Sequence, residues 1–158
     1  LKQRRYQEKV VREYETQADS VNLGDQIYHH FGNVNEQTMN ILQDMSSSFT
    51  QDISLNSIAE KYHFSVAYLS RMIKKETGYS FSEILNSMRL TEAVWLLQED
   101  NVKIGLVCEK AGFRDSRYFS QVFKKVFGCS PGEFRKNSEE HKTYRIKTIL
   151  EMIKENTK

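Results

Sequence analysis

The strongest constraint on the fold of this chain is a stretch of nine residues that occurs twice. SRMIKKETG at positions 70–78 returns as SQVFKKVFG at 120–128, with the serine, both lysines and the closing glycine in register. The correspondence continues on the N-terminal side, where residues 55–64 match residues 104–113. Two copies are too few for a solenoid, which needs at least about three repeats to bury its core. The sequence therefore predicts one supersecondary unit that is used twice.

Each copy has the pattern of a short helix, a tight turn and a second helix. The turn needs a residue that tolerates positive φ, and Gly112 stands there in the second copy and His63 in the first. An N-cap residue precedes each second helix and a glycine ends it: Ser65 and Gly78, then Asp115 and Gly128. Each copy is therefore expected to be a helix-turn-helix.

Composition and the position of the copies predict an all-α fold. The 158 residues include one proline and seven glycines, and alternating β-branched runs are absent. Two helix-turn-helix subdomains are expected, joined by a long central helix, with extra helical segments at both ends. The expected divisions are a helical linker or upstream remnant (1–35), a two-copy domain (36–136) with a first subdomain (36–78), a connecting helix (81–98) and a second subdomain (102–136), and a C-terminal amphipathic helix (138–158). Gly24 and Gly32 predict a break in the chain between them.

The second helix of each copy carries a polar face that burial does not explain. Apolar residues at helical spacing predict its buried side: Tyr68, Leu69, Met72 and Ile73, then Tyr118, Phe119, Val122 and Phe123. The opposite side carries small and polar residues: Ala67, Ser70 and Arg71, then Ser116, Arg117, Ser120 and Gln121. Pairs of lysines follow in each copy: Lys74 and Lys75, then Lys124 and Lys125.

A polar helix face of this kind suits the major groove of double-stranded DNA. The groove is about 12 Å wide and accepts a helix, and small residues such as Ala67 let the helix backbone approach the base edges. Arginine can pair bidentately with guanine and glutamine with adenine, so Arg71, Arg117 and Gln121 are candidate base readers. The lysines suit phosphates. The change from Arg71 to Gln121 at matching positions predicts two helices that read different bases.

Composition limits the other functions open to the chain. The net charge is +2, and residues 52–137 hold 13 Lys and Arg against 10 Asp and Glu. An excess of this size is weak evidence for a polyanionic partner, so the positions of the charges must decide. No catalytic triad, Gly-rich phosphate loop or pair of carboxylates is found, so enzyme activity is not expected. Neither the adjacent His29 and His30 nor the separated Cys108 and Cys129 have further ligands at metal-binding spacing. No metal or cofactor is therefore expected.

The sequence also indicates where the protein works. No stretch approaches the roughly 18 uncharged apolar residues that a membrane span requires. Two cysteines without partners fit free thiols in a reducing compartment. Without a membrane span or an apolar signal segment, the protein is expected in the cytoplasm. Because the first residue is Leu1, we expect a fragment of a longer protein.

Two long segments resemble the AraC/XylS family of bacterial transcription regulators. GFRDSRYFSQVFKKVFGCSPGEFR at 112–135 fits the family signature nearly throughout, and YLSRMIKKETGYSFSEILNSMRLTEAVWLL at 68–97 is similar to its first recognition helix and connecting helix. The resemblance covers residues 36–136. Three positions depart from the family pattern: Ile73, Gly105 and Cys108.

The resemblance implies a seven-helix unit that reads double-stranded promoter DNA through two successive major grooves and usually activates transcription by contacting RNA polymerase. It assigns the base-facing positions to the seven polar-face residues of the two helices named above. It also favours structural roles for Arg89, Glu133 and Arg135. Family members usually carry a sensor domain ahead of this unit, and the residues that precede it here are too few to form one.

A second function stays open, in which the amphipathic ends of the chain bind a partner or form a homodimer through residues 1–21 or 138–158. The C-terminal segment has an apolar stripe that packs either on the domain or on a partner chain: Ile146, Ile149, Leu150 and Ile153. An enzyme is a third class, because AraC-type units also occur fused to DNA repair methyl acceptors that hold zinc with clustered cysteines. The two separated cysteines exclude that cluster from this sequence.

Overall fold

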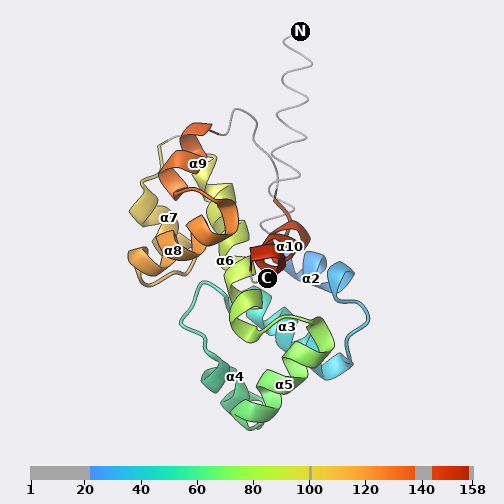
Figure 1. Cartoon of the computed structure of the whole chain (residues 1–158). Helices are drawn as coiled ribbons and strands as arrows, with labels where there is room; N and C mark the ends of the chain where they lie inside the picture. The colour runs from blue at the N-terminus through green and yellow to red at the C-terminus, as the bar shows by residue number, and fades with distance from the viewer. Residues whose placement is uncertain (1–21, 100, 138–143, 157–158) are drawn as a thin grey trace.

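The computed structural model describes residues 22–99, 101–137 and 144–156, and within these ranges every regular element is an α-helix. The helices are α2 (Leu23–His30), α3 (Glu36–Ser48), α4 (Leu55–Lys61), α5 (Val66–Thr77), α6 (Phe81–Leu97), α7 (Ile104–Lys110), α8 (Ser116–Phe127), α9 (Pro131–Asn137) and α10 (Ile146–Asn156). The all-α fold class is confirmed (Figure 1). The helix expected within residues 1–21 lies outside the described residues. None of the described helices is long and apolar enough to cross a bilayer.

The central helix α6 carries two hydrophobic cores, one along each half. Its N-terminal half packs with α2, α3, α4 and α5, and its C-terminal half packs with α7 and α8. Leu69 and Ile73 of α5 fill the first core, and the matching Phe119 and Phe123 of α8 fill the second, with none of the four exposed to solvent. Full burial of a side chain of this size stabilises a fold by about 1.5–3 kcal/mol. Each copy of the repeat is therefore held by a core of its own.

The turns and caps follow the predicted chemistry. The turn residues His63 and Gly112 have φ of 59° and 95°, so the left-handed conformation expected at both places is confirmed. The Ser65 hydroxyl accepts a hydrogen bond from the Tyr68 amide at 3.1 Å, and Asp115 caps α8 in the same way. Glycines in the left-handed conformation end both helices, at φ of 81° and 79°. The second helices of the two copies, α5 and α8, are both 12 residues long.

The break expected between Gly24 and Gly32 is wrong, because α2 occupies this segment. Leu23, Ile27 and Phe31 recur every four residues, are all buried, and pack into the first core. Gly24 lies in the first turn of the helix, where a glycine lowers helix stability only slightly, and Gly32 follows the helix end. The apolar spacing therefore outweighs the two glycines.

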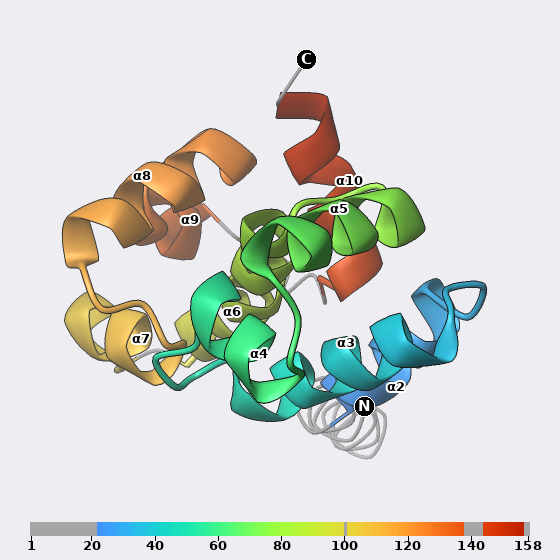
Figure 2. The same cartoon turned by 90° about the horizontal axis from the view of Figure 1, so that it is seen from below.

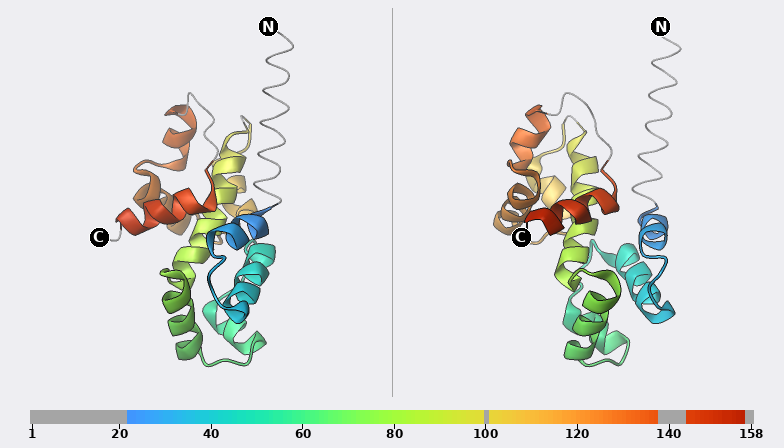
Figure 3. Two further views of the ribbon diagram at one scale, coloured as in Figure 1. Left: turned by 90° about the vertical axis from the view of Figure 1, so that its right-hand side faces the viewer. Right: turned by 45° about the vertical axis from the view of Figure 1, so that its right-hand side comes forward.

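Helix α10 packs on the chain itself, which answers for this segment the question that the sequence left open. Ile146 and Leu150 belong to the first core, and Ile149 and Ile153 belong to the second. Two views show the helix lying across the middle of α6 (Figure 3).

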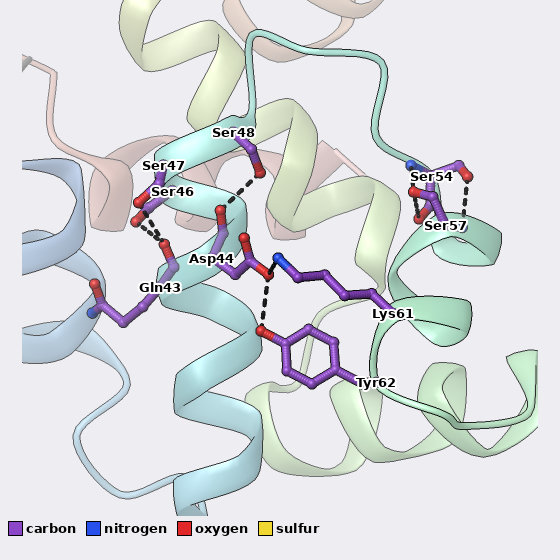
Figure 4. A network of polar contacts seen from close by, with 9 residues as sticks. All are labelled: Gln43, Asp44, Ser46, Ser47, Ser48, Ser54, Ser57, Lys61 and Tyr62. Carbon is purple, nitrogen blue, oxygen red and sulfur yellow. Dashed lines mark hydrogen bonds and ion pairs between the residues drawn. The ribbon is translucent and has the colours of Figure 1, made fainter.

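A polar network ties the first helix of the first copy to α3. Asp44 of α3 points toward the end of α4, where it contacts the Lys61 ammonium at 2.6 Å and accepts a hydrogen bond from the Tyr62 hydroxyl at 2.9 Å (Figure 4). The hydrogen bond from Lys61 lowers the pKa of Asp44. Burial, together with the hydrogen bond and charge of Asp44, raises the pKa of Tyr62 to about 12. The network therefore favours the carboxylate and the neutral phenol together.

Tyr62→Phe is expected to reduce the loss of stability at alkaline pH. The folded state holds the Tyr62 proton more tightly than the unfolded state, so this stabilisation is complete below the ordinary tyrosine pKa of about 10. It is lost as pH rises toward the folded pKa of about 12. Phenylalanine cannot ionise, although its loss of the Asp44 hydrogen bond costs about 1 kcal/mol at neutral pH.

The measurement is the free energy of unfolding in urea at several pH values from neutral to strongly alkaline. Tyr28→Phe, at a tyrosine that is 61% exposed, is the matched control. Equal alkaline slopes for the wild type and Tyr62→Phe would contradict the expectation.

Candidate nucleic-acid interface

The candidate residues all lie on exposed faces of α5 and α8, the second helices of the two copies. Those on α5 are Ala67, Ser70, Arg71, Lys74 and Lys75, and those on α8 are Ser116, Arg117, Ser120, Gln121, Lys124 and Lys125. Arg71 and Gln121 stand at matching positions, six residues after the N-caps Ser65 and Asp115. In Figure 2, α5 and α8 run in the same general direction, and α4 and α7, the first helices of the two copies, lie below them. The structure thus presents two equivalent polar faces.

The buried sides of the two helices differ in chemistry. The buried side of α5 consists of three side chains without rings, Leu69, Met72 and Ile73. Behind α8 lies a chain of aromatic rings, in which Phe119 and Phe123 have ring centroids 5.8 Å apart and Phe123 contacts further rings at 4.5 and 5.4 Å. Aromatic pairs at such separations contribute about 0.5–1.5 kcal/mol beyond their area. The same outer geometry is therefore supported by two different cores.

The prediction that Tyr68 and Tyr118 belong to the core is wrong, since they are 45% and 44% exposed. Each is the third residue of its helix and lies at the edge of the core, where its ring packs against a phenylalanine. The Tyr68 ring lies 5.1 Å from that of Phe64, and the Tyr118 ring lies 6.3 Å from that of Phe113. Val122, also expected in the core, is only partly buried.

These two tyrosines are additional candidates for the interface. A tyrosine hydroxyl can donate a hydrogen bond to a DNA phosphate. Apolar spacing alone assigns tyrosine to the core, and the signal that could have found this role is the amphipathic nature of the side chain. In the second copy the Tyr118 hydroxyl accepts a hydrogen bond from the Asn86 amide of α6 at 3.0 Å.

The segment after α3 connects the first subdomain to the turn of the second copy. Arg89 of α6 donates hydrogen bonds from Nε to the Phe49 carbonyl at 2.8 Å and from Nη2 to the Gln51 carbonyl at 3.1 Å. Its guanidinium also lies 5.9 Å from the ring centroid of Phe113. Arg89 therefore has a structural role.

Arg135 and Glu133 also make contacts within the fold. The Nε of Arg135 donates to the Leu97 carbonyl at 3.1 Å, which ties α9 to the end of α6. The Glu133 amide donates to the Ser130 hydroxyl at 3.2 Å. The Arg135 contact fits the structural role expected of that residue, whereas the Glu133 contact is made by the backbone amide, so the structural role of the Glu133 side chain stays a prediction.

A groove of about 320 Å³ borders the polar face of α8. It lies between α6, α8 and α10, and its polar lining includes Asn86, Gln121, Lys125 and Asn156. Gln121 therefore projects beside the C-terminal end of α10 as well as toward solvent.

Within the described ranges, no cluster of three or more histidine, cysteine or acidic side chains could hold a metal ion. Cys108 is buried and Cys129 is partly buried, and burial raises the pKa of both thiols. A raised thiol pKa disfavours the thiolate, which is the form that binds metals and acts as a nucleophile.

Comparison with known proteins gives the same domain. A family model for a helix-turn-helix domain matches residues 58–137. The HTH-type transcriptional activator RhaR of Pectobacterium atrosepticum is 36% identical over 95 residues, which are 60% of this chain and 34% of that protein. An uncharacterized HTH-type transcriptional regulator of Bacillus subtilis, YtdP, is 35% identical over 96 residues, which are 61% of this chain and 12% of that protein. The chain thus spans about a third or less of the length of these two relatives.

Solved structures show the same arrangement of helices. The C-terminal domain of AraT, a response regulator from Geobacillus stearothermophilus, superposes with a TM-score of 0.62 at 36% identity, over 66% of this chain and 87% of that one. The C-terminal domain of the response regulator yesN from Fusobacterium nucleatum superposes with a TM-score of 0.59 at 31% identity, over 63% of this chain and 99% of that one. Two helix-turn-helix copies on one central helix, together with the family match and these relatives, show that the chain belongs to the AraC/XylS family of DNA-binding transcription regulators.

Proposed function

We propose that this chain is the sequence-specific DNA-binding part of a transcriptional activator, and that it inserts α5 and α8 into successive major grooves of promoter DNA. The observation that carries the proposal is the pairing of two reading helices of equal length whose polar faces are exposed at matching positions. A structural repeat would explain the matching buried residues. It would not explain why exposed polar residues also recur.

The two faces supply different base contacts. Arg71 on α5 suits the O6 and N7 acceptors of guanine, and Gln121 on α8 suits the N6 donor and N7 acceptor of adenine. Arg117 and the small residues Ala67 and Ser116 lie nearer the helix N-termini, where a close approach of the backbone to the bases is needed. The lysines later in each helix suit the phosphate backbone.

The role of activator rests on similarity. RhaR, one of the relatives, is named a transcriptional activator. A contact with RNA polymerase in the bacterial cytoplasm, and a sensor domain elsewhere in the whole protein, are proposed on the same ground. The rival function as an interaction module loses support at the C-terminal end, because the apolar stripe of α10 is buried in the two cores of the chain itself.

The proposal is tested by selecting bound sequences from a random duplex pool and then measuring affinity by fluorescence anisotropy against salt concentration. Four to six phosphate contacts predict that affinity falls by about 100-fold or more between 50 and 200 mM salt. Lys124→Ala is expected to reduce the slope of log K against log salt by about 1.

Lys61→Ala is the matched control, because the Lys61 ammonium is bound to Asp44 of α3. It should leave the salt slope unchanged. Binding that is indifferent to salt, or a selection that enriches no sequence, would contradict the proposed function.

A further inference from the structure

Helix α10 lies beyond the part of the chain that matches the family model, and it bridges the two subdomains. The match ends at residue 137, and α10 begins at Ile146. One stripe of the helix, Ile146 and Leu150, is buried in the first core, and a second stripe, Ile149 and Ile153, is buried in the second. A helix that only covered one subdomain would need one stripe.

Polar contacts secure both ends of α10 to different parts of the fold. At its start, the Ile146 amide donates a hydrogen bond to Oε1 of Gln26 on α2 at 2.9 Å. At its end, Nδ2 of Asn156 donates to the Val126 carbonyl, in the last turn of α8, at 3.2 Å. The Lys154 ammonium lies 5.8 Å from the ring centroid of Tyr79, which belongs to the first core. The helix therefore reaches from α2 to the second reading helix.

The bridge limits how the subdomains can move. They are also joined through α6, the Arg89 contacts, the Asn86–Tyr118 hydrogen bond and an exposed ion pair between Arg114 and Asp52 at 3.4 Å. A bend of α6 would change the angle between α5 and α8, but it would also pull α10 out of one of its two cores. A rotation of one reading helix relative to the other is therefore opposed by apolar burial as well as by the stiffness of α6.

We infer that α10 sets the spacing between the two DNA half-sites, so that this chain selects spacer length as well as base sequence. The inference rests on the proposed function, since it needs two reading helices that bind one duplex. Each added base pair turns the second half-site by about 35° around the helix axis. A rigid pair of readers must twist or bend the DNA to follow, and the energy of that deformation appears as lost affinity.

The test uses duplexes that carry both selected half-sites with the spacer shortened or lengthened by one or two base pairs. For the wild type, affinity is expected to fall at least about 10-fold at two base pairs from the optimum, because DNA of this length resists twisting and bending. In the double variant Ile149→Ala/Ile153→Ala, which empties only the stripe in the second core, the fall is expected to shrink to about 3-fold or less, as α10 loosens its hold on that core. Affinity for a duplex with one half-site should stay the same.

Three further variants separate this role from a general loss of stability. Ile149→Val/Ile153→Val should restore the wild-type spacer profile, and Thr148→Ala, on the exposed side of α10, should leave it unchanged. Asn156→Ala removes the hydrogen bond to the Val126 carbonyl, keeps both cores, and should broaden the profile to a smaller extent. If the double alanine variant does not fold, the spacer profile of Asn156→Ala tests the spacing role of α10 in its place.

Three results would overturn the spacing role: a wild type that binds all spacers alike while needing both half-sites, α10 variants that fold and keep the narrow profile, or a wild type that needs only one half-site. The last of these would leave DNA binding intact. A wild type that binds no duplex would instead contradict the proposed function, and this inference with it.

Discussion

Arg71→Ala is expected to remove base preference at one position of the DNA site, and Gln121→Ala is expected to remove it at another. Each loss should cost about 1–3 kcal/mol of discrimination against the wrong base, which corresponds to about 5- to 150-fold in relative affinity. Both side chains are exposed at matching positions on α5 and α8. Their helices are fixed from behind by fully buried pairs, so truncating an exposed residue leaves the scaffold in place.

The measurement is the affinity for duplexes that carry single base substitutions across the selected site. Gln121→Arg tests the assignment more directly than Gln121→Ala, because an arginine at this position should shift the base preference from adenine toward guanine. Lys75→Ala is the control, since a lysine that contacts phosphate should weaken all duplexes by a similar factor.

The base-reading assignment would be contradicted if Arg71→Ala and Gln121→Ala weakened all duplexes equally, as the lysine variant does. If Arg71→Ala and Gln121→Ala both changed base preference in the same half of the site, that result would contradict the assignment of one base-reading residue to each copy. The selected motif would then belong to a single helix.

The repeat made most of the fold predictable. Apolar residues at matching positions, Leu69 with Phe119 and Ile73 with Phe123, identify side chains that are fully buried in the structure. Caps and turn residues act within a few residues of chain, so Ser65, His63 and the closing glycines could be assigned from local chemistry. These features need no knowledge of what packs where.

The parts that could not be predicted depend on contacts between distant segments. Tyr68 and Tyr118 have the spacing of core residues, and only the position of the core edge decides that they face outward. The division of the α10 stripe between two cores depends on how α6 separates them, which no local pattern contains. The contact of residues 49–51 with Arg89 joins positions about forty residues apart.

Gly112→Ala is expected to destabilise the fold strongly. A Cβ at this position would lie 2.7 Å from the Phe49 carbonyl oxygen and 2.7 Å from the Thr50 Cα, which are backbone atoms that cannot turn aside. It would also lie 3.2 Å from Nε of Arg89, the atom that donates to the Phe49 carbonyl. The φ of +95° adds a strain of about 1–2 kcal/mol for a residue with a side chain.

Taken together, the strain and the disturbed Arg89 hydrogen bonds should lower the free energy of unfolding by about 3–5 kcal/mol. This is a large part of the roughly 5–15 kcal/mol that stabilises a typical domain. Urea unfolding followed by circular dichroism measures the loss.

Two other glycines of the chain separate the causes of this loss. At Gly78, φ is +81° and a Cβ would meet nothing within 4 Å, so Gly78→Ala should cost only the backbone strain of about 1–2 kcal/mol. Gly105 lies in the first turn of α7 with open space around it, so Gly105→Ala should leave stability unchanged or raise it by less than the roughly 1 kcal/mol that separates Gly from Ala in a helix interior. Equal losses for Gly112→Ala and Gly78→Ala would show that the contact with residues 49–50 adds nothing. The larger loss expected at Gly112 would measure how tightly the first subdomain is joined to the turn of the second reading unit.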